Sequence, residues 1–130
     1  MGGRRVVNVA ALPGAMSHPK FTHGRHRPVV QFIMDWNDQP AMRSEMLCDG
    51  QPPIGGVPRD LALIAAVVHG LCDRDGITAP GWVSSHRLES PVTMTGQPVD
   101  DNWGQWVVSQ APQVCADHGI YFEEEMLSAI

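Results

Sequence analysis

The strongest constraint on this chain is an unbroken apolar segment at residues 61–68, framed by a proline and a glycine. Its eight residues, Leu-Ala-Leu-Ile-Ala-Ala-Val-Val, have no polar stripe of the kind that a surface helix shows. A short apolar run of this type also fits a buried strand. However, Pro58 fits the first turn of a helix, and Gly76 fits the position after its last turn. We therefore predict a buried helix over residues 59–74 at the centre of the fold.

Proline and glycine also divide the rest of the chain into short elements. Eleven prolines and thirteen glycines occur in 130 residues, and they predict further helices or turns over residues 28–36, 40–50, 80–83, 102–108, 112–119 and 123–129. Residues 90–96 are the best candidate for a strand, and residues 120–122 are the short run that could pair with it. The predicted fold is mainly α, a compact bundle of about five to six short helices around one buried central helix, with room for one short two-stranded element.

Charge divides the chain near residue 35. Residues 1–34 carry no acidic residue and five cations, namely Arg4, Arg5, Lys20, Arg25 and Arg27. Residues 35–130 carry four arginines against fourteen acidic residues, a net charge of −10. We predict a flexible basic arm over residues 1–27 and a single helical domain over residues 28–130. The five cations either contact an anionic partner or belong to a frayed terminus, and they limit nucleic-acid binding to weak, non-specific phosphate contacts.

The cysteines and the N-terminal segment indicate the compartment. Cys48, Cys72 and Cys115 are an odd number, whereas a secreted disulfide framework favours an even one. The apolar run after Arg5 is interrupted by Asn8 and stops before Pro13, too early for a signal peptide. No apolar stretch reaches the roughly 18 residues of a membrane-spanning helix. We therefore expect a cytoplasmic protein without a membrane partner.

One pattern of residues suits a metal ion. His69 and Cys72 lie three residues apart, and so do Cys115 and His118. Residues three apart share a helix face, so two such helices in contact could assemble four ligands for zinc. In the alternative interpretation, both cysteines are core residues, both histidines lie near helix C-termini, and the protein needs no cofactor.

The remaining candidate residues are aromatic. Motifs such as GxGxxG, the Walker loop, HExxH and GxSxG do not occur, so we expect a non-enzymatic protein. Trp82, Trp103 and Trp106 are candidates for the core or for an interface with a protein partner or a second copy of the chain. The main functional hypothesis is thus a protein-interaction domain, and the alternative is a small zinc-binding or ligand-binding domain.

The order of these features resembles a known group of bacterial domains. The chain has Pro-Pro-Ile-Gly-Gly-Val-Pro-Arg-Asp before the apolar helix, then His-Gly-Leu-Cys-Asp-Arg-Asp-Gly-Ile-Thr-Ala-Pro-Gly-Trp, Leu-Glu-Ser-Pro, Gln-Ala-Pro and His-Gly-Ile-Tyr-Phe. Over residues 28–130 this resembles the C-terminal half of helix-turn-helix antitoxin-like regulators, which often occur beside nucleotidyltransferase-type toxins. Residues 1–27 cannot form a helix-turn-helix, so the resemblance implies binding to a partner protein rather than sequence-specific DNA binding.

Overall fold

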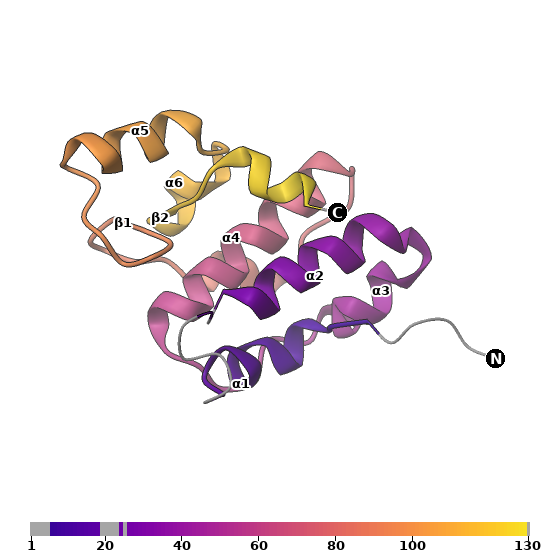
Figure 1. The fold of residues 1–130 in the computed structure, drawn as a ribbon. Helices are drawn as coiled ribbons and strands as arrows, with labels where there is room; N and C mark the ends of the chain where they lie inside the picture. Colours follow the sequence, from indigo (N-terminus) through magenta and orange to yellow (C-terminus); the bar gives the residue numbers. More distant parts are fainter. Residues whose placement is uncertain (1–5, 19–23, 25, 130) are drawn as a thin grey trace.

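The fold is built around one long helix. The computed structural model describes residues 6–18, 24 and 26–129, and in it α4 (Pro58–Arg74) lies at the centre (Figure 1). Pro58 is its first residue, as predicted, and Ile64, Val68 and Leu71 are fully buried. α4 contacts α1, α2, α6, the 3-10 helices η5 and η6, and strand β2. The predictions of a mainly α fold and of a buried central helix are confirmed.

The first half of the chain covers one side of α4. It contains η1 (Val9–Ala11), α1 (Leu12–Met16), α2 (Arg27–Asp38), η3 (Pro40–Met42), α3 (Arg43–Met46) and η4 (Cys48–Gly50). α2 starts with proline in its first turn and buries Phe32, Ile33 and Trp36 completely. In Figure 1 these elements are coloured indigo to magenta, and they lie below and beside α4.

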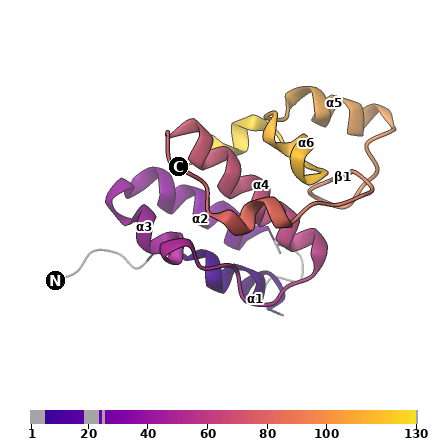
Figure 2. The same cartoon turned by 180° about the vertical axis from the view of Figure 1, so that it is seen from behind.

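The second half of the chain contains the shorter elements. They are η5 (Gly81–Ser85), β1 (Val92–Thr93), α5 (Asn102–Gln110), α6 (Val114–His118), β2 (Ile120–Tyr121) and η6 (Glu124–Ser128). β1 and β2 pair in parallel, with Val92 opposite Ile120 and Thr93 opposite Tyr121, which confirms the predicted two-stranded element. Seen from behind, η5 crosses α4 on the face opposite α2 (Figure 2).

The predicted boundary between arm and domain needs a correction. Val9, Leu12 and Met16 are at most 2% exposed and belong to the hydrophobic core. The buried carboxylate of Asp35 accepts a hydrogen bond from the backbone N–H of Val7, at 2.9 Å. The apolar run at the N-terminus is too short for a signal peptide, but it is long enough to pack against α2 and α4. The folded domain therefore includes residues before position 28. Positions 1–5, 19–23 and 25 of the predicted arm lie outside the described residues.

The segment expected to form one helix over residues 40–50 is broken into three pieces. Cys48 and Asp49 both have a φ of 52°, in the left-handed region, and Gly50 follows with a φ of 89°. This backbone cannot continue a right-handed helix, so α3 ends at Met46 and the chain turns through η4.

Within the described ranges, no helix has both the length and the apolar character needed to cross a membrane.

Candidate functional site

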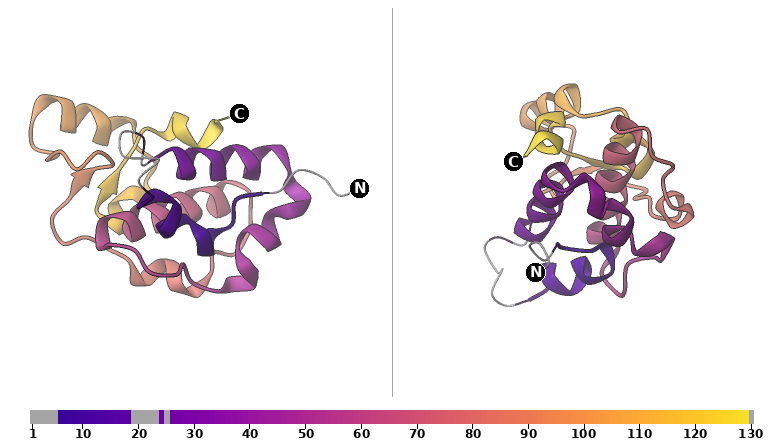
Figure 3. Two further views of the ribbon diagram at one scale, coloured as in Figure 1. Left: turned by 60° about the horizontal axis from the view of Figure 1, so that its bottom comes forward. Right: turned by 90° about the vertical axis from the view of Figure 1, so that its right-hand side faces the viewer.

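α5 carries the most exposed aromatic residues of the described chain. Trp103 is 51% exposed and Trp106 is 45% exposed, and their rings stack with centroids 5.1 Å apart. They are three residues apart, so they share one face of the helix. Figure 3 shows α5 in orange at one end of the molecule, away from α1–α3. Two of the three predicted tryptophans therefore form one solvent-facing pair.

The local sequence explains why α5 presents this face. Asp101 caps the helix by accepting a hydrogen bond from the N–H of Gly104, at 2.6 Å. A Cβ on Gly104 would lie 2.5 Å from the carbonyl oxygen of Pro98 and from Cα of Val99. Only glycine therefore permits the close approach of α5 to the preceding loop, while Val107 is the side chain that α5 buries.

Trp82 lies in a different environment from the α5 pair. It is half-buried in η5, packs against the hydrophobic core and approaches the ring of His86, with a centroid distance of 6.1 Å. Its indole Nε1 is buried without a hydrogen-bond partner among the described residues. The structure thus places Trp82 with the packing residues and not with Trp103 and Trp106.

The predicted metal ligands are only partly brought together. His69 on α4 and His118 on α6 meet, with Nδ1 of His69 3.0 Å from Nε2 of His118. The cysteines do not complete the set: Cys72 and Cys115 lie in the hydrophobic core, 1% and 0% exposed.

Burial raises the pKa of Cys72 and of Cys115 to about 11, in keeping with their place in the hydrophobic core. Among the described residues, no three His, Cys, Asp or Glu side chains lie close enough to share one metal ion. The hypothesis of a Cys2His2 site is therefore corrected: the residues form a histidine pair and two separate core cysteines.

Hydrogen bonds determine how this histidine pair is oriented. Nδ1 of His118 lies 2.7 Å from the carbonyl oxygen of His86, and because a carbonyl only accepts, His118 carries its proton on Nδ1. A second bond, from the N–H of Leu88 to the carbonyl of His118 at 2.9 Å, holds the same segment in place. In the neutral pair, Nε2 of His118 then accepts from Nδ1 of His69, and Nε2 of His69 is left with a free lone pair.

A cavity of about 390 Å³ opens beside the histidine pair. Its polar and charged lining comes from His69, His118, Ser84, Arg87 and Asp117, and its apolar lining includes Ala79, Pro80 and Val83. His118 is 2% exposed, and burial is the main reason that its pKa is lowered below 6.5. Both ring nitrogens of His118 are thus bonded within the protein, and the charged residues that line the hollow, Arg87 and Asp117, are exposed.

A larger hollow of about 690 Å³ lies between the end of α4, α6 and η6. Its charged lining is mostly acidic, from Asp73 and from Glu123, Glu124 and Glu125. The cation beside them, Arg74, donates hydrogen bonds to the carbonyl of Leu127 at 2.7 Å and to Asp75, so it belongs to the packing of the C-terminal segment.

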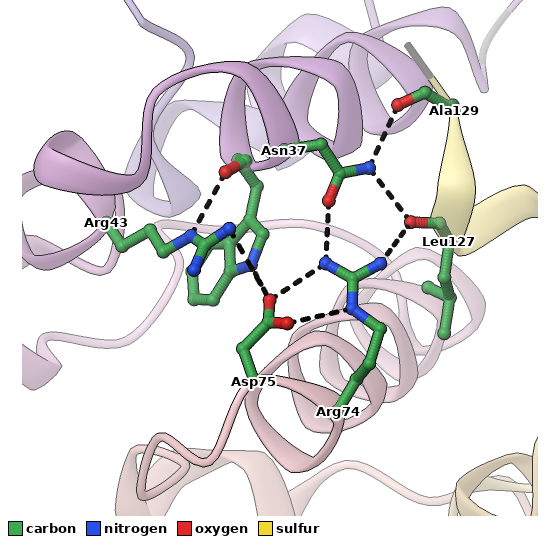
Figure 4. Close-up of polar contacts among 7 residues, drawn as sticks. Asn37, Arg43, Arg74, Asp75, Leu127 and Ala129 are labelled. Atoms are coloured by element: carbon green, nitrogen blue, oxygen red, sulfur yellow. Dashed lines mark hydrogen bonds and ion pairs between the residues drawn. The ribbon is translucent and has the colours of Figure 1, made fainter.

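The densest group of polar contacts joins α2, the end of α4 and the C-terminal segment (Figure 4). Asp75 accepts from the indole Nε1 of Trp36 at 2.7 Å and from Nε and Nη2 of Arg74 at 3.0 and 2.8 Å. Asn37 donates to the carbonyls of Leu127 and Ala129, both at 2.9 Å. The hydrogen bonds that Asp75 accepts lower the pKa of its carboxyl group to about 2, and the bond from Arg74 is the largest cause. Arg43 joins the group through Nη2, which lies 3.5 Å from Oδ2 of Asp75, and we name the whole the Asp75 clamp (Trp36, Asn37, Arg43, Arg74 and Asp75).

The Asp75 clamp was not predicted from the sequence. Trp36 and Asp75 are 39 positions apart, and neither residue type signals its partner. Of the predicted basic residues, Arg27 is exposed at the start of α2, while Arg4, Arg5, Lys20 and Arg25 lie outside the described residues. The described residues therefore give no observation that supports contact of these five basic residues with an anion.

Comparisons with known proteins found no matching protein family, no curated protein and no solved structure similar to this chain.

Proposed function

We propose that this protein is a non-enzymatic protein-interaction domain, antitoxin-like in its mode of action, that binds a partner protein through α5. The observation that carries this proposal is the stacked pair of Trp103 and Trp106, half-exposed on one helix face. Tryptophan is among the residues that most often dominate the binding energy of interfaces. The resemblance to antitoxin-like regulators supports the same role, and three free cysteines fit a cytoplasmic protein.

The composition of α5 supports a contact that depends on apolar burial. Its nine residues, Asn-Trp-Gly-Gln-Trp-Val-Val-Ser-Gln, include no acid and no base, although the whole chain has a net charge of −5. Charge depletion with enriched tryptophan is typical of the centre of an interface. A partner bound there should stay bound at high salt, because apolar burial is not screened by ions.

The test is recovery of the partner from the source cell at low and high salt. Wild type is compared with Trp106→Ala and with Ile54→Ala, a matched control that is also apolar and 74% exposed but lies outside α5. We expect Trp106→Ala to lose the partner at both salt concentrations and Ile54→Ala to retain it. The recovered protein is then identified, purified and titrated against both variants by calorimetry.

Two results would contradict the proposal. One is a purified partner that binds wild type and Trp106→Ala with equal affinity. The other is tight, sequence-selective duplex DNA binding that survives high salt and is lost when Met1–Arg5 are removed, which would make the protein a DNA-binding regulator. If wild type is a dimer that Trp106→Ala turns into a monomer, the partner is a second copy of the chain.

A further inference from the structure

We propose that the cavity beside His69 and His118 binds a small zwitterion, an α-amino acid with an apolar side chain. This ligand site goes beyond the partner-binding role of α5. It uses different elements, the cavity between α4, η5 and α6, and residues that the partner surface does not include.

The histidine pair supplies a hydrogen-bond acceptor inside the cavity. The carbonyl of His86 fixes the proton of His118 on Nδ1, so His118 accepts from His69 and Nε2 of His69 keeps its lone pair. His69 is half-buried and lines the cavity. An imidazole held in this tautomer accepts a hydrogen bond at Nε2 from the N–H of a ligand ammonium group and has no N–H to donate at that nitrogen.

Two opposite charges on the cavity wall complement the two ends of a zwitterion. Arg87 and Asp117 both line it, and among the described residues neither forms an ion pair with the other or with any other side chain. The carboxylate of Asp117 suits an ammonium group, for which Nε2 of His69 is a further acceptor in the same cavity lining, and the guanidinium of Arg87 suits a carboxylate. A simple anion or a simple cation would satisfy only one of these charges.

The remaining wall suits an apolar side chain. Ala79, Pro80 and Val83 face the same cavity. Its volume of about 390 Å³ lies in the range of small-molecule sites, about 300–1,000 Å³, and such sites combine an apolar lining with a few convergent polar groups. An amino acid with an aliphatic or aromatic side chain fits this combination of shape and charge.

Calorimetric titration with L-leucine, L-methionine and L-phenylalanine tests the proposal, with a chelator in all solutions so that no metal takes part. For leucine, 4-methylpentanoate keeps the carboxylate alone and 3-methylbutylamine keeps the ammonium alone. We expect saturable binding of at least one amino acid. For leucine, each single-charge analogue should bind about tenfold or more weakly, because it loses a charge-assisted hydrogen bond.

Two variants separate the cavity residues from general folding. Asp117→Asn removes the carboxylate charge, and His69→Asn keeps a side-chain N–H near the position of Nδ1 while removing Nε2. Both should weaken amino-acid binding about tenfold. Glu45→Gln, an equal charge change at an exposed position on α3, should leave affinity unchanged. Circular dichroism of each variant checks that it is folded.

Three outcomes would overturn the proposal: no saturable binding of any of the three amino acids at millimolar concentration, equal binding of a single-charge analogue and leucine, or unchanged affinity in folded Asp117→Asn. If His69→Asn does not fold, Asp117→Asn alone decides, because Asp117 is exposed and forms no side-chain bond among the described residues.

Discussion

The central helix α4 and the peripheral helix α5 differ in how far their large apolar side chains are exposed to solvent. Ile64, Val68 and Leu71 of α4 have no exposed surface, and the Asp75 clamp fastens the end of the helix to α2 and to the C-terminal segment. α5 buries Gly104 and Val107 and leaves its two tryptophans about half exposed. In α4 the large apolar side chains stabilise the fold, whereas in α5 they face solvent.

This difference separates residues needed for folding from residues available for binding. Burial of one aliphatic side chain contributes about 1.5–3 kcal/mol, a large fraction of a typical net stability of about 5–15 kcal/mol, so a change at a buried position of α4 is costly. Exposed tryptophans contribute far less to stability and retain most of their apolar surface for a partner.

Replacing a core residue of α4 should abolish folding. Ile64→Asp places a carboxylate where the native side chain has no exposed surface, and an uncompensated buried charge exceeds the stability of an ordinary domain. We expect no cooperative thermal transition by circular dichroism. Asp73→Ala, at an exposed position of the same helix, should melt like wild type, and a folded Ile64→Asp protein would show that α4 is not the core.

Breaking the Asp75 clamp should have a smaller, pH-dependent effect. Asp75→Asn weakens the bonds to Trp36 and Arg74 and should cost about 1.5–3 kcal/mol at neutral pH, measured by urea unfolding. Because folding lowers the pKa of Asp75 from 3.8 to about 2, its contribution is complete above about pH 4 and is lost as the pH falls toward 2. Wild type and variant should therefore converge in acid, and a constant difference at all pH values would contradict this account.

The positions of the helices could be predicted because the prolines and glycines that start and end a helix lie next to it in the sequence. Pro58 marks the start of α4, and the left-handed Gly119 marks the end of α6. Pairing of β1 with β2 was predicted from β-branched and aromatic residues, but its parallel direction was not. The burial of Val9, Leu12 and Met16 was missed although their spacing of three and four residues is that of a helix, because the segment is short and packs only through contact with distant parts of the chain, α2 and α4.

The site residues were harder to predict because their contacts are long-range. The zinc hypothesis required His69, Cys72, Cys115 and His118 to meet, and in the structure only the two histidines do, while the cysteines are core residues as in the other interpretation. Spacing along a helix does not determine which side chain of a pair faces the neighbouring helix. His86 could not be recognised as a partner because its backbone carbonyl, and not its ring, orients His118.

Acid should weaken the fold modestly through His118. Burial lowers its pKa below 6.5, so the unfolded chain binds a proton more readily than the folded protein. The stability contribution of the neutral form is therefore present above about pH 6.5 and is lost as the pH falls below it. Urea unfolding from about pH 8 to about pH 5 should show this loss in wild type and a flatter profile in His118→Asn. Equal slopes would contradict it.

The double variant Trp103→Ala/Trp106→Ala tests the division between α4 and α5 most directly. Its melting temperature and its recovery of the partner at high salt are measured on the same preparation. The account predicts a stability change of about 1 kcal/mol or less, since both side chains are half exposed, together with loss of the partner. A fall in melting temperature as large as that of a core variant, or full retention of the partner, would contradict it.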